Sequence, residues 1–217
     1  MITPELILTF KKLTFMNLVN RAKNMLLTPK TEWQAVLEEQ PVNNQIIMGY
    51  LVPFVLLGAV AAFIGYGLIG FSVLGFHTVG VSWGIYNAIL RIVLGIGSMY
   101  VTAFVLDALA PSFGSQKDMG RSMQLVVYGS TPSLVAGLFA FLPLLSGIVA
   151  LAGAVYSIYL WYLGLGPIKN TPEDKKVVYL LVTYAVLLVV YFILSAILAL
   201  ILLPIFGLGT MAGGFHL

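Results

Sequence analysis

The chain has 217 residues, of which 60% are hydrophobic and 9% are charged, with a formal net charge of +3. A soluble domain has about a quarter of its residues charged, so this composition excludes a soluble globular protein and indicates a membrane protein. Cysteine is absent and the basic residues are sparse, which excludes disulfides and iron–sulfur centres and argues against a nucleic-acid partner.

Residues 1–45 hold five of the eleven basic residues and form a predicted cytoplasmic arm. Within it, residues 5–27 have apolar side chains on one side of a helix and polar side chains on the other, which predicts an amphipathic helix. This helix can lie in the membrane interface, or its apolar side can pack on the ends of the spans, and the sequence leaves both open. The residues expected to contact the membrane surface are Lys11, Lys12, Arg21 and Lys23.

A second short helix is predicted to begin at Thr28-Pro29, because threonine is a frequent N-cap and proline is favoured at the first helical position. Its apolar side would include Trp33 and Val36, whereas Glu32 is expected to be exposed. Pro41 ends the helix.

Five long stretches with almost no charge follow the arm. An apolar helix of about 20 residues crosses the hydrocarbon core of a bilayer, and each stretch is long enough to do so. The predicted fold class is therefore all-α, a polytopic integral membrane protein with five transmembrane helices, an N-terminal amphipathic arm and an outer tail at 206–217. The predicted spans of this membrane domain (46–205) are 46–70, 83–110, 122–141, 144–166 and 176–205.

The third and fourth stretches form one uncharged block, so charge alone does not distinguish two full crossings from a re-entrant hairpin. Length favours two crossings. Pro132 lies inside the third stretch and predicts a kink there, because proline removes a backbone donor and nearby Ser and Thr can satisfy the carbonyl that it frees.

The basic residues predict the orientation of the protein. Ten of the eleven lie in the arm or in alternate gaps between the stretches, and positively charged loops stay on the cytoplasmic side. The N-terminus is therefore expected inside and the C-terminus outside.

Arg91 is the one basic residue in the interior of a predicted span, since Lys176 stands at the very start of the fifth. A charge in the membrane is costly and marks a candidate functional site, here a contact for a lipid phosphate or another anion. The alternative is that its long side chain reaches toward the interface and bonds there to phosphate or backbone carbonyls.

Asp107 is the only acidic residue in a predicted span, and sixteen residues separate it from Arg91 on the same helix. The two side chains therefore cannot pair. Asp107 lies near the cytoplasmic end, where an ion pair with Arg121 is expected, and Lys117 is the other candidate.

No pattern of residues predicts catalysis. There is no nucleophile elbow, no paired carboxylates and no His–carboxylate pair, and two histidines without a third ligand make a poor metal site. We therefore expect no enzymatic activity, no metal and no cofactor.

One set of motifs resembles a known family. Leu27-x-Pro29-x3-Trp33 precedes the first span, and Gly, Pro and aromatic positions recur in order over the last three. These positions are Tyr128, Pro132, Pro143, Tyr156-Ser157-Ile158, Gly164-Leu165-Gly166 and 171–176. Over about residues 24–205 the chain resembles the Yip (Ypt/Rab-interacting protein) family, and its bacterial members most.

The resemblance implies a five-span membrane domain with a cytoplasmic N-terminus. Eukaryotic members act in vesicle traffic and bind prenylated Rab GTPases, but here Gly129 follows Tyr128 and the acidic motif before the first span is not clear, so Rab binding is not carried over. The expected function is a scaffold or adaptor that engages the bilayer and an unknown protein partner from the cytoplasmic side, with homo-oligomerisation possible. The alternative is a lipid or small-solute translocator that uses Arg91 and the kink at Pro132.

Overall fold

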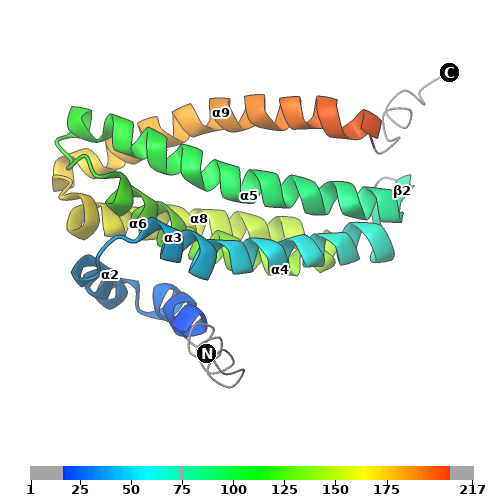
Figure 1. Ribbon diagram of the computed structural model, residues 1–217, viewed down its shortest axis with the longest axis horizontal. Helices are drawn as coiled ribbons and strands as arrows, with labels where there is room; N and C mark the ends of the chain where they lie inside the picture. The colour runs from blue at the N-terminus through cyan, green and yellow to red at the C-terminus, as the bar shows by residue number, and fades with distance from the viewer. Residues whose placement is uncertain (1–16, 74–75, 206–217) are drawn as a thin grey trace, which may run out of the picture.

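The computed structural model describes residues 17–73 and 76–205. Lys11, Lys12 and the tail 206–217, for which the sequence made predictions, lie outside the described residues. The described part is a bundle of long helices lying side by side, with a short helical arm against one end (Figure 1). The prediction of an all-α polytopic membrane protein is confirmed, and one small hairpin is added to it.

The first span is a continuous helical stretch over Asn43–Ile69. Its residues are almost all apolar, and small residues lie where it meets other helices. It then leads into an antiparallel hairpin that pairs Phe71 with Thr78 and Val73 with Phe76. The elements are α3 (Asn43–Ile46), the π-helical turn η1 (Ile47–Leu51), α4 (Val52–Phe63), the π-helical turn η2 (Ile64–Ile69), β1 (Phe71–Val73) and β2 (Phe76–Thr78).

Within residues 17–73 and 76–205, four helical segments are long and apolar enough to cross a membrane, and a fifth segment is broken. The broken segment consists of Met119–Gly129 and Thr131–Phe141, which are bent by 44°. The remaining elements are α5 (Val81–Leu109), η3 (Ala110–Phe113), α6 (Met119–Gly129), α7 (Thr131–Ala136), η4 (Gly137–Phe141), α8 (Pro143–Lys169), η5 (Glu173–Lys175) and α9 (Lys176–Ile205).

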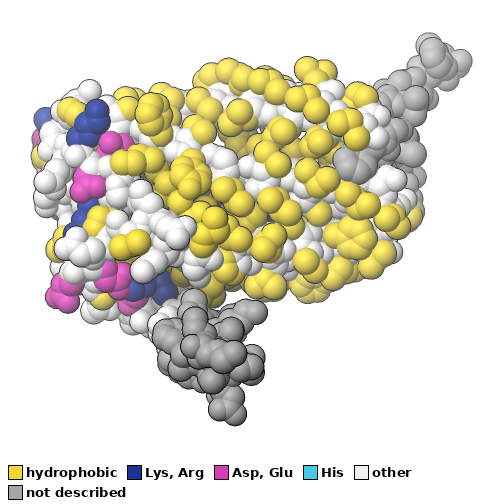
Figure 2. Space-filling model, viewed as in Figure 1, with side chains coloured by type: hydrophobic (Ala, Val, Ile, Leu, Met, Phe, Trp, Pro, Cys, Tyr) yellow, Lys and Arg dark blue, Asp and Glu magenta, His cyan; other side chains and the backbone are white. Residues whose placement is uncertain are grey.

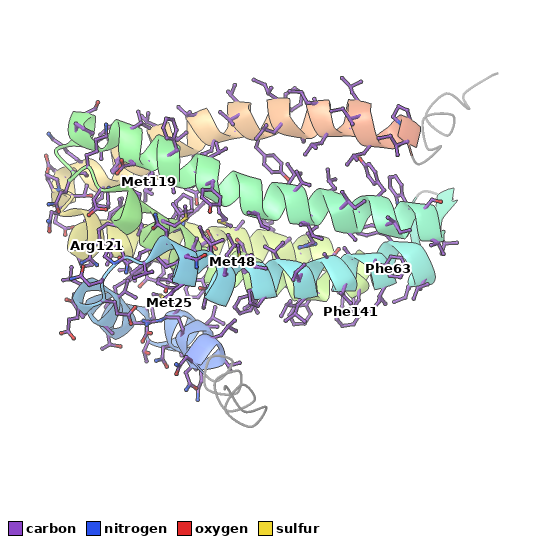
Figure 3. All side chains as sticks on the ribbon, in the orientation of Figure 1. Met25, Met48, Phe63, Met119, Arg121 and Phe141 are labelled. Atoms are coloured by element: carbon purple, nitrogen blue, oxygen red, sulfur yellow. The ribbon has the colours of Figure 1, made fainter. Side chains whose placement is uncertain are left out.

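The broken segment extends along most of the bundle. Met119 lies near the end that holds the arm, whereas Phe141 lies near Phe63 toward the opposite end (Figure 3). A Cβ at Gly65, near the end of the first span, would meet the Ala140 carbonyl oxygen at 2.2 Å. This close approach favours two full crossings over a re-entrant hairpin.

Charge and apolar surface are separated along the bundle. In Figure 2 the Lys, Arg, Asp and Glu side chains gather at one end, and hydrophobic side chains cover the rest of that face. Large exposed apolar side chains such as Leu151, Leu188 and Phe192 would be costly in water and suit contact with lipid. We call the end with the charged residues the charged end.

The main core lies in the half of the bundle near the charged end. Leu51, Ala103, Leu106, Leu125 and Leu160 are buried there with less than 1% exposure. A smaller cluster of Ala61, Ala62 and Ala140 lies farther along, where helices approach closely through small side chains.

The arm packs on the bundle. Residues 17–27 are helical, and Leu18, Ala22 and Met25 join the main core. The second helix, α2 (Pro29–Glu38), follows Thr28 as predicted and buries Trp33 and Val36. The sequence left open whether this helix lies in the membrane interface or packs on the spans. Its described part packs on the spans.

Candidate functional site

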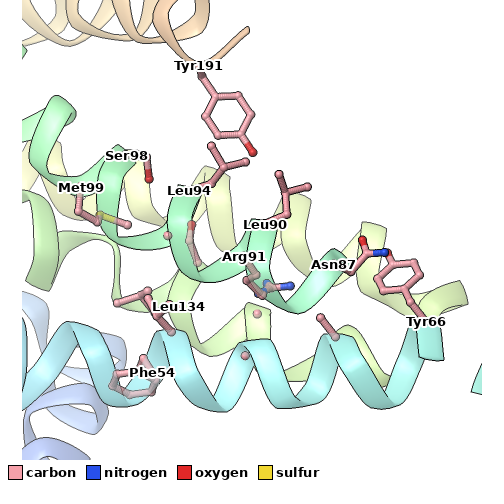
Figure 4. A pocket seen from close by; sticks show the side chains of 16 residues that line it. Phe54, Tyr66, Asn87, Leu90, Arg91, Leu94, Ser98, Met99, Leu134 and Tyr191 are labelled. Atoms are coloured by element: carbon pink, nitrogen blue, oxygen red, sulfur yellow. The ribbon is translucent and has the colours of Figure 1, made fainter. Parts of the chain in front are cut away.

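Arg91 lies on α5, and its side chain points into the space between α5, α4 and η4 (Figure 4). Two glycines make room for the guanidinium. A Cβ at Gly58 would lie 3.1 Å from Nε, and a Cβ at Gly137 would lie 2.6 Å from Nη2. Glycine at these two positions therefore lets an arginine fit between the helices.

The guanidinium borders a cavity of about 420 Å³. Polar groups on this cavity come from Asn87 and Ser98 of α5, Ser133 of α7 and Tyr191 of α9. Apolar side chains such as Phe54, Leu90 and Leu134 form much of the remaining wall. Figure 4 shows Asn87 and Tyr66 on the hairpin side of Arg91.

Arg91 makes no ion pair within residues 17–73 and 76–205. The phenol side chains of Tyr66 and Tyr191 line the same cavity. The carboxylates of the described chain lie toward the charged end, so this half-buried cation has no counter-charge from them.

Asp107 does have a counter-charge, but not the predicted one. Lys169 Nζ lies 2.9 Å from Asp107 Oδ1 and also donates to Ser122 Oγ at 2.7 Å and the Asp118 carbonyl at 3.1 Å. Ser122 Oγ and the Asp118 backbone N–H donate to the same Asp107 oxygen. The Lys169 side chain is fully buried, so this pair is part of the core.

The predicted pair between Asp107 and Arg121 is wrong. Arg121 Nη1 donates to the carbonyls of Val36 and Glu39 and to Gln124 Oε1, at 3.0–3.3 Å. Arg121 follows the α6 N-cap Asp118 and points toward the end of α2. There it shares the Val36 carbonyl with the Glu39 backbone N–H and also bonds to the Glu39 carbonyl. It therefore fastens the arm to the bundle.

Arg21 is also not the membrane-surface residue that we predicted. Its guanidinium forms ion pairs with Glu32 and Glu39 and lies 5.2 Å from the ring centroid of Tyr128. Glu32 is consequently buried and not exposed as expected. Burial alone would lower the pKa of Arg21, but the Glu39 and Glu32 carboxylates more than offset this and raise it. Lys23, by contrast, is exposed.

The motif position Tyr128 lies at the break between α6 and α7. Its ring meets the edge of Tyr50 with centroids 5.0 Å apart. Thr131 Oγ1 donates to the Tyr128 carbonyl at 2.5 Å, so the hydroxyl of Tyr50, 2.7 Å from Thr131 Oγ1, is the donor to it. Pro132 stands in the first turn of α7. Pro132 has no N–H to donate to the Tyr128 carbonyl, and the Thr131 hydroxyl donates to that carbonyl instead, as predicted.

The motif glycines Gly164 and Gly166 make room for side chains from other elements. A Cβ at Gly164 would lie 2.5 Å from Leu125 Cδ1 and 2.8 Å from the Trp33 ring. A Cβ at Gly166 would lie 2.7 Å from Lys176 Nζ, which pairs with Glu173 and lies over Tyr162. Their place in the motif is explained by packing.

Two loops at the charged end are joined to each other. The Gln116 backbone N–H donates to the Lys169 carbonyl at 2.8 Å, and the hydroxyls of Ser115 and Thr171 are 2.8 Å apart. Asn170 Nδ2 donates to Gln116 Oε1 at 3.1 Å. We call residues 114–118 and 170–175 the end loops.

Sequence reasoning missed Lys169 and Tyr191. The predicted fourth span ended at Gly166, but α8 continues through Pro167 and carries Lys169 to Asp107. Tyr191 had no distinguishing signal, because only the packing of α9 brings it to the Arg91 cavity. In the described part of the chain, no group of three or more His, Cys, Asp or Glu residues is arranged to hold a metal ion.

A family model described as the Yip1 domain matches residues 23–196. This range contains Trp33, the Arg91 cavity and the Asp107–Lys169 pair. No curated protein and no solved structure matches the chain.

Proposed function

We propose a function for this chain, which belongs to the Yip1 domain family of membrane proteins. It is a non-enzymatic scaffold or adaptor whose charged end engages a protein partner. The observation that carries this proposal is the separation of charge along the bundle. On the face shown in Figure 2 the charged side chains gather at the charged end, whereas Arg91 lies within α5 on the cavity that Asn87 and Tyr66 also line.

The end loops and the arm present charged side chains that are not used within the bundle. Lys30, Lys117, Asp174 and Lys175 are exposed and make no ion pair among the described residues. The end loops are held in place by hydrogen bonds to each other. A surface that is already ordered loses little conformational entropy on binding, which favours recognition there.

We further propose that the charged end faces the cytoplasm of a bacterial inner membrane and that the hairpin end faces outward, with the arm before residue 46 and five spans up to residue 205. Because the chain has no cysteine, single cysteines test this directly. A membrane-impermeant maleimide added to intact cells should label Val81→Cys but not Lys117→Cys or Lys175→Cys, and all three should be labelled after lysis. Labelling of Lys117→Cys and Lys175→Cys in intact cells would show that the orientation is the opposite of the one proposed.

The partner surface is tested with photo-crosslinking residues in place of Lys30, Lys117 and Lys175, in intact membranes. We expect adducts with another protein from these positions and none from Val81, which is exposed at the hairpin end. Lys117→Glu combined with Lys175→Glu should reduce the adduct at position 30 several-fold. Adducts confined to position 81, or adducts of the chain with itself alone, would contradict the adaptor role, the second in favour of a homo-oligomer.

Deletion of the arm is not a suitable test, because residues 17–45 contribute Met25, Trp33 and Val36 to the main core. Loss of binding after such a deletion would report loss of the fold.

A translocator is the second candidate, and the Arg91 cavity is the observation in its favour. The cavity reaches α7 just after the bend at Pro132. Between it and the charged end, however, the main core is filled by fully buried side chains such as Leu51, Ala103 and Leu106. A continuous path would require these to move apart, so we favour the scaffold. Movement of a lipid or a small solute across the membrane of liposomes that contain the purified protein would reverse that preference.

A further inference from the structure

The Arg91 cavity holds a positive charge for which the described chain supplies no negative one. Arginine stays charged in proteins and presents five N–H donors in a planar fork. Inside a membrane such a group persists where it is paired or reaches water. Within residues 17–73 and 76–205 its side chain has no carboxylate partner, so any counter-charge comes from outside this part of the chain.

We propose that this cavity binds the phosphate of an anionic phospholipid, with Arg91 as the group that holds it. A guanidinium binds phosphate oxygens through two parallel hydrogen bonds. Ser98 and Tyr191 place hydroxyls on the same cavity, and no carboxylate lines it. Hydroxyl donors beside a cation, without acidic groups, favour an anion over a cation.

The size and walls of the cavity suit a lipid headgroup with the start of its chains. Ligand sites in proteins have volumes of about 300–1,000 Å³, and this one has about 420 Å³. Phe54, Leu90 and Leu94 form apolar walls beside the polar groups. A free phosphate ion would use the guanidinium but not these walls.

The cavity opens toward lipid. Its α9 wall is Tyr191, which is 51% exposed, and the neighbouring Phe192 is 72% exposed. The helix α9 packs mainly on α5 and α8, whereas the cavity lies between α5 and α4. Toward the charged end the main core closes it. A ligand therefore enters sideways from the bilayer.

The depth of Arg91 fits this entry. It follows the first residue of α5, Val81, by ten residues, or ~15 Å along the axis. The helical segment Val81–Phe113 has 33 residues and is ~50 Å long, longer than the ~30 Å hydrocarbon core. Arg91 accordingly lies in the half of the bilayer toward the hairpin end. From there its long side chain can meet the phosphate of a lipid in that leaflet. The proposal does not rest on the adaptor role.

The test measures lipid binding to the full chain in detergent by native mass spectrometry, with phosphatidylglycerol and phosphatidylcholine as probes. Arg91→Gln should weaken phosphatidylglycerol binding by about tenfold or more, the effect of losing one charge-assisted hydrogen-bonded pair. Lys175→Gln, which removes an exposed charge of the end loops far from the cavity, should leave it unchanged. Equal binding by wild type and Arg91→Gln would overturn the proposal.

A second pair of variants moves the guanidinium without removing it. Gly137→Ala places a methyl group 2.6 Å from Nη2, at the flexible end of the arginine, and should weaken binding several-fold. Gly97→Ala on α5 meets nothing within 4 Å and should not. The melting temperature of Arg91→Gln should equal or exceed that of wild type, because no ion pair within the described chain is lost, and a large decrease would assign Arg91 a structural role instead.

Inorganic phosphate separates the two sources of the anion. If the lipid is the ligand, millimolar phosphate should leave phosphatidylglycerol binding unchanged. If phosphate itself binds in an Arg91-dependent way and excludes the lipid, the assignment to a lipid is overturned and the site belongs to a soluble anion.

Discussion

Replacing Lys169 with methionine is expected to lower the free energy of unfolding by about 3–5 kcal/mol, the range for breaking a buried ion pair by removing one partner. Methionine keeps most of the volume of lysine but removes all three hydrogen bonds from Nζ. Asp107 is then left as a buried carboxylate without its cation. Denaturant unfolding in detergent micelles, followed by tryptophan fluorescence, measures the change.

Two further variants show whether the missing charge is the cause. Lys175→Met removes an exposed lysine of the end loops and should change stability by less than about 0.5 kcal/mol. In the double variant Lys169→Met with Asp107→Leu, no unpaired charge remains, and much of the lost stability should return. If Lys169→Met is no more harmful than Lys175→Met, the buried pair does not stabilise the bundle.

Trp33→Ala is expected to cost a similar amount, about 3–5 kcal/mol, as is typical of truncating a large buried aromatic side chain. Trp33 is 1% exposed, its Nε1 donates to the Leu160 carbonyl at 3.1 Å, and its ring lies against Gly164. The change leaves a cavity and removes the anchor of α2. We therefore expect the arm to detach before the spans unfold.

Limited proteolysis of the protein in micelles measures that detachment. Cleavage after Lys23 and Lys30 should be much faster in Trp33→Ala than in wild type, while the fragment that contains the spans persists. Leu27→Ala is the matched control, because Leu27 is on the same arm but 69% exposed. Equal cleavage rates in wild type and Trp33→Ala would mean that other contacts hold the arm.

The spans could be predicted from sequence because they depend on composition within one stretch of chain. Runs of apolar residues are local signals, and the predicted stretches begin and end within a few residues of the apolar helices. The turn at Thr28-Pro29 was equally local. The break at Ser130 followed from Pro132, which restricts the backbone wherever it occurs.

The partners of the charged side chains could not be predicted in the same way. Arg21 meets Glu32 and Glu39 only because two arm helices fold back on each other, and Asp107 meets Lys169 across 62 residues of sequence. Lys169 reaches Asp107 only because α8 continues past Pro167, whereas the sequence offered Arg121 and Lys117. The cavity at Arg91 likewise depends on glycines from α4 and η4, whose spacing gives no sign that they face one arginine.

The last helix is secured at one end only. Near the charged end, Tyr179 is buried, donates to the Leu106 carbonyl and stacks on Phe113. Among the residues of α9 beyond Thr183 whose exposure is described, none is buried. Its 30 residues extend ~45 Å, more than the ~30 Å hydrocarbon core, and tilting of the helix is one way to relieve this mismatch. We expect the tilt to pivot at Tyr179, so that bilayer thickness regulates how far Tyr191 stands from Arg91.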